Sequence, residues 1–219
     1  MKDETKIDEI IKILKKESEK WNVPVVTLIA LQEKDPFKVL LSTIISLRTK
    51  DEVTIEASKR LYEIIKKPED AINIDLKSIE DAIYPAGFYK RKAIQIKNIC
   101  EKLVVDFNSK VPCDIETLLK FEGVGRKTAN LVLSEGYQIP AMCVDTHVHR
   151  ISNRFGYIKT KTPEETEFKL REKLPKKYWI EYNSLLVAFG QSICRPTSPH
   201  CTKCPVLKLC ERVDVKKFR

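Results

Sequence analysis

The chain has 219 residues, enough for one large core or two modest ones, and its 40 basic against 31 acidic residues give a net charge of +9 at pH 7. This excess favours an anionic partner, most simply nucleic acid. Because no run of about 18 apolar residues could span a bilayer and the amino terminus is charged, we expect a cytoplasmic protein without membrane contact.

Apolar residues recur at helical spacing along almost the whole sequence, and no convincing strand pattern is visible. We therefore predict an all-α fold. The clearest predicted helices lie, in chain order, around residues 7–14, 37–45, 53–65 and 93–103.

Further helix boundaries follow in the second half of the chain. Asp114 is a predicted N-cap, and the helix it starts runs into Phe121. Thr162-Pro163-Glu164-Glu165 combines an N-cap threonine with proline at the first helical position and glutamate at the third. A largely apolar helix is predicted over 178–194, and it delivers Cys194.

A Gly123-Val124-Gly125 turn separates two short predicted helices in a chain that has only six glycines. The first amides of a helix have no partners within the helix, and glycines let another backbone approach closely. With Arg126 adding positive potential, the turn is a candidate phosphate site. The alternative is an ordinary helical hairpin whose glycines only permit the turn.

Four of the seven cysteines, Cys194, Cys201, Cys204 and Cys210, fall within seventeen residues with the spacing C-x6-C-x2-C-x5-C. An odd total argues against a disulfide framework, so a metal ion or cluster is expected. Zinc is the generic alternative to an iron–sulfur cluster. The other three cysteines, Cys100, Cys113 and Cys143, lack such spacing and are expected to be small core residues.

Three motifs together carry a family resemblance: "GVGRKTAN" from Gly123, "VDTHVHR" from Val144, and the cysteine series. In order and approximate separation they resemble the endonuclease III family of DNA glycosylases, in the helix-hairpin-helix superfamily, from about Pro36 to Cys210. The resemblance implies a two-lobed fold, with a six-helix barrel domain over 30–139 that includes the hairpin. Residues 1–29 and 140–219 would form an iron–sulfur domain whose four cysteines hold a 4Fe-4S cluster.

The resemblance also implies two catalytic residues. Lys127 lies at the family's nucleophile position, where a neutral amine can attack C1′ of a damaged nucleotide and form a Schiff base. Asp145 matches the family's catalytic carboxylate, which can accept the amine's proton and stabilise the cationic sugar. Its structural alternative is an N-cap for the helix that begins near His147.

The family pattern further suggests residues that contact DNA. A flipped nucleotide leaves a gap, and the positions that would fill it are Arg48 and Phe88, where well-known members have Gln and Leu. Their alternatives are a surface charge and a core aromatic. Arg91 and Lys92 are expected to be phosphate contacts or solvated charges. Glu122 replaces the usual proline before the hairpin. The remaining predicted contacts are Gly123, Val124, Gly125, Arg126, Thr128, His147 and Arg150.

The resemblance implies a bifunctional DNA glycosylase and AP lyase that excises oxidised pyrimidines such as thymine glycol and cleaves 3′ to the abasic site by β-elimination. We expect a monomer, associated with the nucleoid through double-stranded DNA that carries damaged bases or abasic sites. One alternative is a mismatch-specific glycosylase of the same superfamily, although such relatives commonly lack the lysine. Another is a non-enzymatic DNA-binding iron–sulfur protein, against which the paired Lys127 and Asp145 argue.

Overall fold

The computed structural model describes residues 2–219, with side chains from Thr5 onward, and these residues form helices and loops without a strand. The prediction of an all-α fold is confirmed. The chain divides into two compact units: Val25–Ile139, and Met1–Pro24 together with Pro140–Arg219. That these units are the predicted barrel and iron–sulfur domains stays a prediction.

The unit Val25–Ile139 is organised around one buried helix, α3. Side chains on every face of α3 are buried, and it packs against α2, α4, α7 and α9. A helix that is apolar all round must be covered by neighbours. The helices of this unit are α2 (Val25–Glu33), α3 (Pro36–Ser46), α4 (Asp51–Ile64), α5 (Asp70–Asn73), α6 (Leu76–Ile83), α7 (Tyr89–Phe107), α8 (Ile115–Leu118), α9 (Arg126–Leu131) and the π-helical η1 (Val132–Gly136).

Local sequence signals set several of these boundaries. The carboxylate of Asp35 accepts a hydrogen bond from the amide of Phe37 at 2.9 Å, and Pro36 occupies the first helical position of α3. Asp114 caps α8 by accepting from the amide of Thr117 at 2.8 Å, as predicted. Such caps satisfy amides that have no partner inside the helix.

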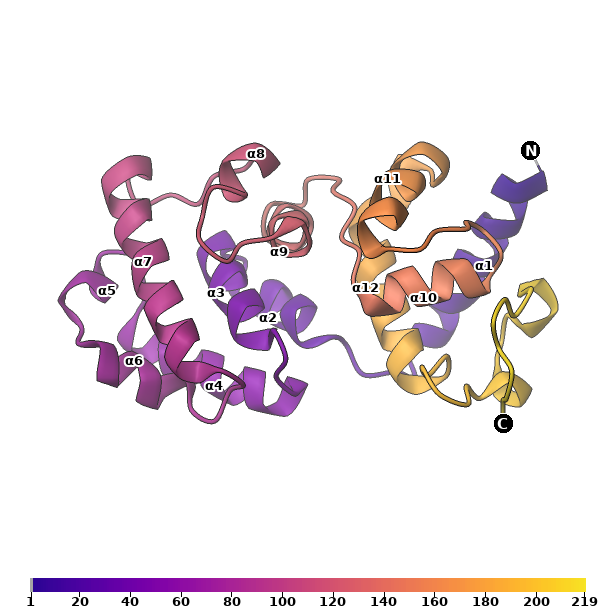
Figure 1. The fold of residues 1–219 in the computed structure, drawn as a ribbon, viewed down its shortest axis with the longest axis horizontal. Coiled ribbons are helices and arrows are strands. Elements are labelled where there is room, and N and C mark those ends of the chain that lie inside the picture. The colour runs from indigo at the N-terminus through magenta and orange to yellow at the C-terminus, as the bar shows by residue number, and fades with distance from the viewer. Residues whose placement is uncertain (1) are drawn as a thin grey trace. The chain divides into compact units, whose positions relative to one another are not determined.

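The other unit joins the first helix of the chain to the last ones. Its helices are α1 (Lys2–Ser18), α10 (Thr146–Arg154), α11 (Pro163–Lys173), α12 (Trp179–Ser192) and the short turns η2 (Lys176–Tyr178), η3 (Cys201–Lys203) and η4 (Leu207–Leu209). Figure 1 shows the indigo α1 beside the orange α12, a pair that the contacts confirm. The i, i+3, i+4, i+7 stripe of α1, Ile7, Ile10, Ile11 and Leu14, is buried in this unit's core.

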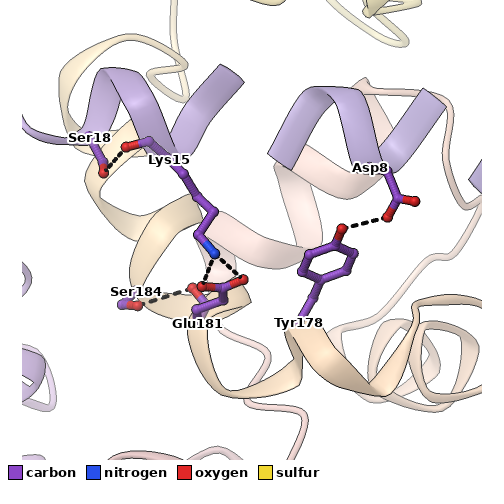
Figure 2. A network of polar contacts seen from close by, with 6 residues as sticks. All are labelled: Asp8, Lys15, Ser18, Tyr178, Glu181 and Ser184. Atoms are coloured by element: carbon purple, nitrogen blue, oxygen red, sulfur yellow. Dashed lines mark hydrogen bonds and ion pairs between the residues drawn. The ribbon is translucent and has the colours of Figure 1, made fainter. Parts of the chain in front are cut away.

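Polar contacts at the surface also join α1 to α12 and to the short turn η2 before it (Figure 2). Lys15 forms an ion pair with Glu181 of α12 at 2.7 Å, and the Tyr178 hydroxyl donates to Asp8 at 2.6 Å. Pairs this exposed contribute about 1 kcal/mol or less each. The apolar stripe therefore stabilises the docking of α1 more than these contacts do.

Among the described residues, no helix is both long and apolar enough to cross a membrane.

Candidate functional site

The two glycines of the hairpin turn differ in what requires them. Gly123 has φ +71°, a left-handed conformation that favours glycine, and a Cβ there would also displace the end of the Gln95 side chain, whose nitrogen would lie 2.5 Å away. Gly125 is the N-cap of α9 with φ −92°, and a Cβ there would meet no atom of the described residues within 4 Å. Glycine is a favoured N-cap residue, and at 125 it also leaves the backbone at the start of α9 uncovered.

Helix α7 holds the turn from one side. The Gln95 amide donates to the backbone carbonyl of Glu122 at 3.1 Å, and the Asn98 amide contacts the Glu122 carboxylate at 3.3 Å. The acid that replaces the family's proline is therefore drawn toward α7. This contact is how the protein accommodates a negative charge beside the hairpin.

Lys127 is the second residue of α9, two positions after Gly125, and is half-buried like Arg126. The side chains of Val124 and Thr128 are buried, at 5% and 3% exposure. Any contact of Val124 or Thr128 with DNA would have to use the backbone. The start of α9 thus presents a lysine, an arginine and an unsubstituted glycine backbone in immediate succession.

Asp145 is the N-cap of α10 in the other unit. Its Oδ1 accepts hydrogen bonds from the amides of His147 and Val148, both at 2.9 Å. The capping role considered from the sequence is therefore present. Since both bonds use Oδ1, the cap fixes the orientation of the carboxylate while Oδ2 takes no part in it.

His147 and Arg150 make contacts inside their own unit. The guanidinium of Arg150 donates to the carbonyl of Cys194 at 2.8 Å and lies 3.1 Å from Nδ1 of His147. A Cβ on Gly190 of α12 would lie 2.3 Å from that same ring nitrogen, so α10 and α12 pack closely here. Both residues link α10 to α12 and its end, a role separate from their predicted DNA contacts.

Arg48 and Phe88 lie side by side in the unit Val25–Ile139. The guanidinium carbon of Arg48 is 5.7 Å from the centroid of the Phe88 ring. Phe88 is 63% exposed, so the alternative that it is a core aromatic is wrong. Both residues have positive φ, +54° for Arg48 and +59° for Phe88.

The burial of Lys92 differs from what its sequence position led us to expect. Arg91 is exposed, whereas Lys92 is only 5% exposed, so it is neither a phosphate contact nor a solvated charge. Burial lowers the pKa of Lys92 to about 8. The sequence held a signal for this, because Lys92 lies four residues before Ile96 and seven before Ile99, on the buried stripe of α7.

The four closely spaced cysteines line a single small cavity of about 20 Å³. Cys194 follows the end of α12, and Cys201 begins η3. Burial raises the pKa of the Cys204 thiol to about 12 and also raises the pKa values of Cys201 and Cys210. Thiolates in this environment need a neighbouring cation, as metal ligation supplies.

Among the side chains described, from Thr5 to Arg219, no three or more His, Cys, Asp or Glu side chains are grouped closely enough to hold a metal ion. Of the other cysteines, Cys100 and Cys143 are buried as expected, but Cys113 is exposed, so its prediction as a core residue is wrong. Cys113 follows a proline just before α8, in a loop that the apolar core does not cover.

Arg154, at the end of α10, has a role that no sequence motif predicts. It is 9% exposed, and its guanidinium donates to the carbonyls of Arg195 and Pro196, both at 2.7 Å. The same group lies 3.4 Å from the sulfur of Cys194. A buried arginine thus organises the loop that follows the first cysteine of the series.

Three kinds of comparison with known proteins agree. Residues 41–176 match the model of the HhH-GPD superfamily of base excision DNA repair proteins. Endonuclease III of Thermotoga maritima is 47% identical over 180 residues, which cover 82% of this chain and 84% of that protein. Endonuclease III of Bacillus subtilis is 36% identical over 82% of this chain and 83% of its own. A trapped endonuclease III–DNA covalent intermediate superposes with a TM-score of 0.84 at 33% identity, covering 95% and 96% of the two chains.

Proposed function

Because the chain belongs to the endonuclease III family of bifunctional DNA glycosylases and AP lyases in base excision repair, we propose that it excises oxidised pyrimidines, thymine glycol among them, from double-stranded DNA. Lys127 is the nucleophile of this reaction and Asp145 its carboxylate partner. The observation that carries the proposal is the start of α9, where Lys127 stands two residues after Gly125, a glycine that leaves the backbone open to close approach. A relative trapped covalently on DNA supports the same chemistry.

In the proposed reaction, the neutral amine of Lys127 forms a bond to C1′ of the damaged nucleotide as the bond from C1′ to the base breaks. Asp145 takes up the proton that the amine loses and stabilises positive charge on the sugar. The sugar ring then opens to a Schiff base. Loss of a proton from C2′ expels the 3′ phosphate, which nicks the strand, and water releases the enzyme.

The hairpin is proposed to bind the DNA backbone next to the lesion. Phosphate oxygens at the start of α9 would meet backbone N–H groups, the helix dipole and Arg126. A side chain at 125 would stand between this surface and the phosphate. The tie between Asn98 and Glu122 would limit repulsion by holding the acid toward α7.

Four thiols that line one cavity are the donor set of an iron–sulfur cluster, and we propose that Cys194, Cys201, Cys204 and Cys210 hold a 4Fe-4S cluster there. Four thiols face one cavity, and the guanidinium of Arg154 lies beside the first of them to offset negative charge. When bound, the cluster would cross-link loops that have little regular structure, leaving catalysis to other residues. Iron and sulfide content with a broad visible absorption band would support this assignment. A colourless protein containing one zinc ion would contradict it.

Borohydride trapping tests the nucleophile. The protein is incubated with a duplex that carries one thymine glycol, the reductant is added, and covalent adducts are separated on a denaturing gel. We expect an adduct from the wild type and none from Lys127→Gln. Lys110→Gln, the same change at an exposed lysine outside the hairpin, should behave as the wild type. The absence of any wild-type adduct, with DNA binding intact, would contradict the substrate assignment.

Asp145 is tested by Asp145→Asn, because asparagine keeps the N-cap while removing the charge. We expect single-turnover excision to fall by about a hundredfold or more, as befits loss of a general base, with thermal stability little changed. Asp114→Asn is the matched control, since Asp114 is also an N-cap but lies at α8. Equal activity of the two variants would show that Asp145 only caps its helix.

We also propose that the protein is a monomer. Sedimentation of the free protein and of its DNA complex tests this.

A further inference from the structure

Two exposed side chains stand on backbone that their residue types rarely adopt. Phe88 and Arg48 both have φ in the left-handed region, at +59° and +54°, and neither is glycine. A bulky residue in this region is a genuine outlier that persists only where the surrounding structure holds it. The question is what holds these two.

Beneath the pair lies the buried ammonium of Lys92. It donates to the carbonyls of Ile45 and Leu47, both at 2.6 Å, and to the hydroxyl of Thr49 at 2.9 Å. The carbonyls at the end of a helix have no partners within it, so Lys92 of α7 caps the end of α3. All three ammonium protons are thereby used, and the chain on either side of Arg48 is fixed.

The same network reaches the segment that carries Phe88. The Thr49 hydroxyl also accepts from the amide of Gly87 at 3.0 Å. A Cβ at Gly87 would lie 2.4 Å from the carbonyl oxygen of Arg48, so the two backbones touch. Arg48 and Phe88 thus project from two segments that Lys92 and Thr49 join into one support.

We propose that Lys92 is a positioning residue for nucleotide flipping, holding Arg48 and Phe88 as a preformed pair that fills the gap in the duplex. The inference rests on the proposed function and on the expectation, drawn from the family resemblance, that these two side chains enter the DNA. The contact of the guanidinium with the aromatic face orders both side chains before binding. Groups ordered in advance lose less freedom on binding, which favours the flipped state.

Lys92→Met tests the proposal, because methionine keeps an unbranched apolar stem but cannot donate. Two substrates separate flipping from chemistry: a duplex with one thymine glycol beside 2-aminopurine, and a single strand with a preformed abasic site, which needs no flipping. On the duplex we expect single-turnover excision to fall roughly tenfold to a hundredfold, with loss of the fluorescence rise that reports unstacking. Adduct formation on the single strand should change by less than about twofold.

The matched control is Lys97→Met. Lys97 also lies on α7 and also donates to a backbone carbonyl, that of Ile74 at 2.7 Å, but it is not part of this support. It should leave both substrates at wild-type rates. If Lys92→Met folds poorly, Thr49→Val removes the link to Gly87 at constant shape and should slow duplex excision in the same direction.

The proposal is overturned if Lys92→Met excises from the duplex at the wild-type rate, if it loses both substrates equally, or if Lys97→Met reproduces its effect. A wild type that forms an adduct with the single strand but never with the lesion duplex would instead contradict the proposed substrate. A wild type that forms no adduct with either would overturn the proposed nucleophilic chemistry and this inference together.

Discussion

The core around α3 and the segment that carries the cysteines are held together in different ways. In α3, Leu40, Leu41, Ile44 and Ile45 are fully buried against neighbouring helices. Beyond Ile193, by contrast, regular structure is limited to the two short turns η3 and η4. That segment is held by hydrogen bonds from the guanidinium of Arg154 and by isolated backbone hydrogen bonds, and its cysteines line one cavity.

This difference shows two solutions to the cost of ordering a chain. Burial of apolar surface scales with area, so a helix surrounded by other helices is stable without specific chemistry. A short segment with few apolar contacts cannot offset its conformational entropy in that way and needs a cross-link or metal. The two regions should therefore respond differently to the same kind of perturbation.

The largest effect is expected from loss of the proposed cluster. Removing iron, or substituting Cys204→Ala, should raise amide hydrogen exchange in residues 195–219 by at least about a hundredfold, because bound metal contributes directly to folding there. Exchange in α3 should stay as in the intact protein. Cys113→Ala, at an exposed cysteine outside the series, is the control and should change neither region. An equal rise in amide exchange in both regions would show that they do not fold separately.

A cavity in α3 should give the opposite pattern. Leu41 is fully buried, so Leu41→Ala should lower the free energy of unfolding by about 2–5 kcal/mol, whereas Leu31→Ala at a 63% exposed position of α2 should change it by less than about 0.5 kcal/mol. Urea unfolding followed by circular dichroism measures both. Visible absorption of the cluster should persist while α3 unfolds, and its loss in step with the helical signal would argue against independent regions.

The smallest effect is expected from a histidine in the cysteine-bearing unit. Burial lowers the pKa of His149, whose Nδ1 lies 2.7 Å from the Thr166 hydroxyl, although the Glu165 carboxylate opposes the shift. As pH falls below about 6.5, the unfolded chain takes up this proton before the folded one, so stability should decline. Urea unfolding between pH 7 and pH 5 should show a shallower decline for His149→Gln. An identical slope would mean that other groups set the acid sensitivity.

Residue spacing was enough to predict much of the architecture. The stripe from Ile7 to Leu14, the N-caps Asp114 and Thr162, and the apolar character of α3 are all visible in the sequence and are all present in the structure. These features depend on nearest neighbours along one helix, which a sequence displays directly. The family and its chemistry were likewise recognisable, because they depend on three local motifs.

Lys92 and Arg154 show where such reasoning stops. Both are charged residues that are buried, and although the buried stripe of α7 indicates the burial of Lys92, nothing local indicates the partners of either residue. These partners are backbone carbonyls 45 and 47 residues earlier in the chain for Lys92 and 41 and 42 residues later for Arg154. A carbonyl carries no side-chain signature, so no motif announces that it will accept such a bond.

Local sequence patterns thus sufficed to predict the longer helices, two of their caps, the hairpin and the cysteine series, since each is encoded over a few turns of chain. Long-range packing instead explains that Phe88 is exposed beside Arg48, that Glu122 is drawn toward Asn98, and that Gly125 faces open space. These outcomes depend on which segments meet after folding. Packing between distant elements fixes them, and local periodicity does not record it.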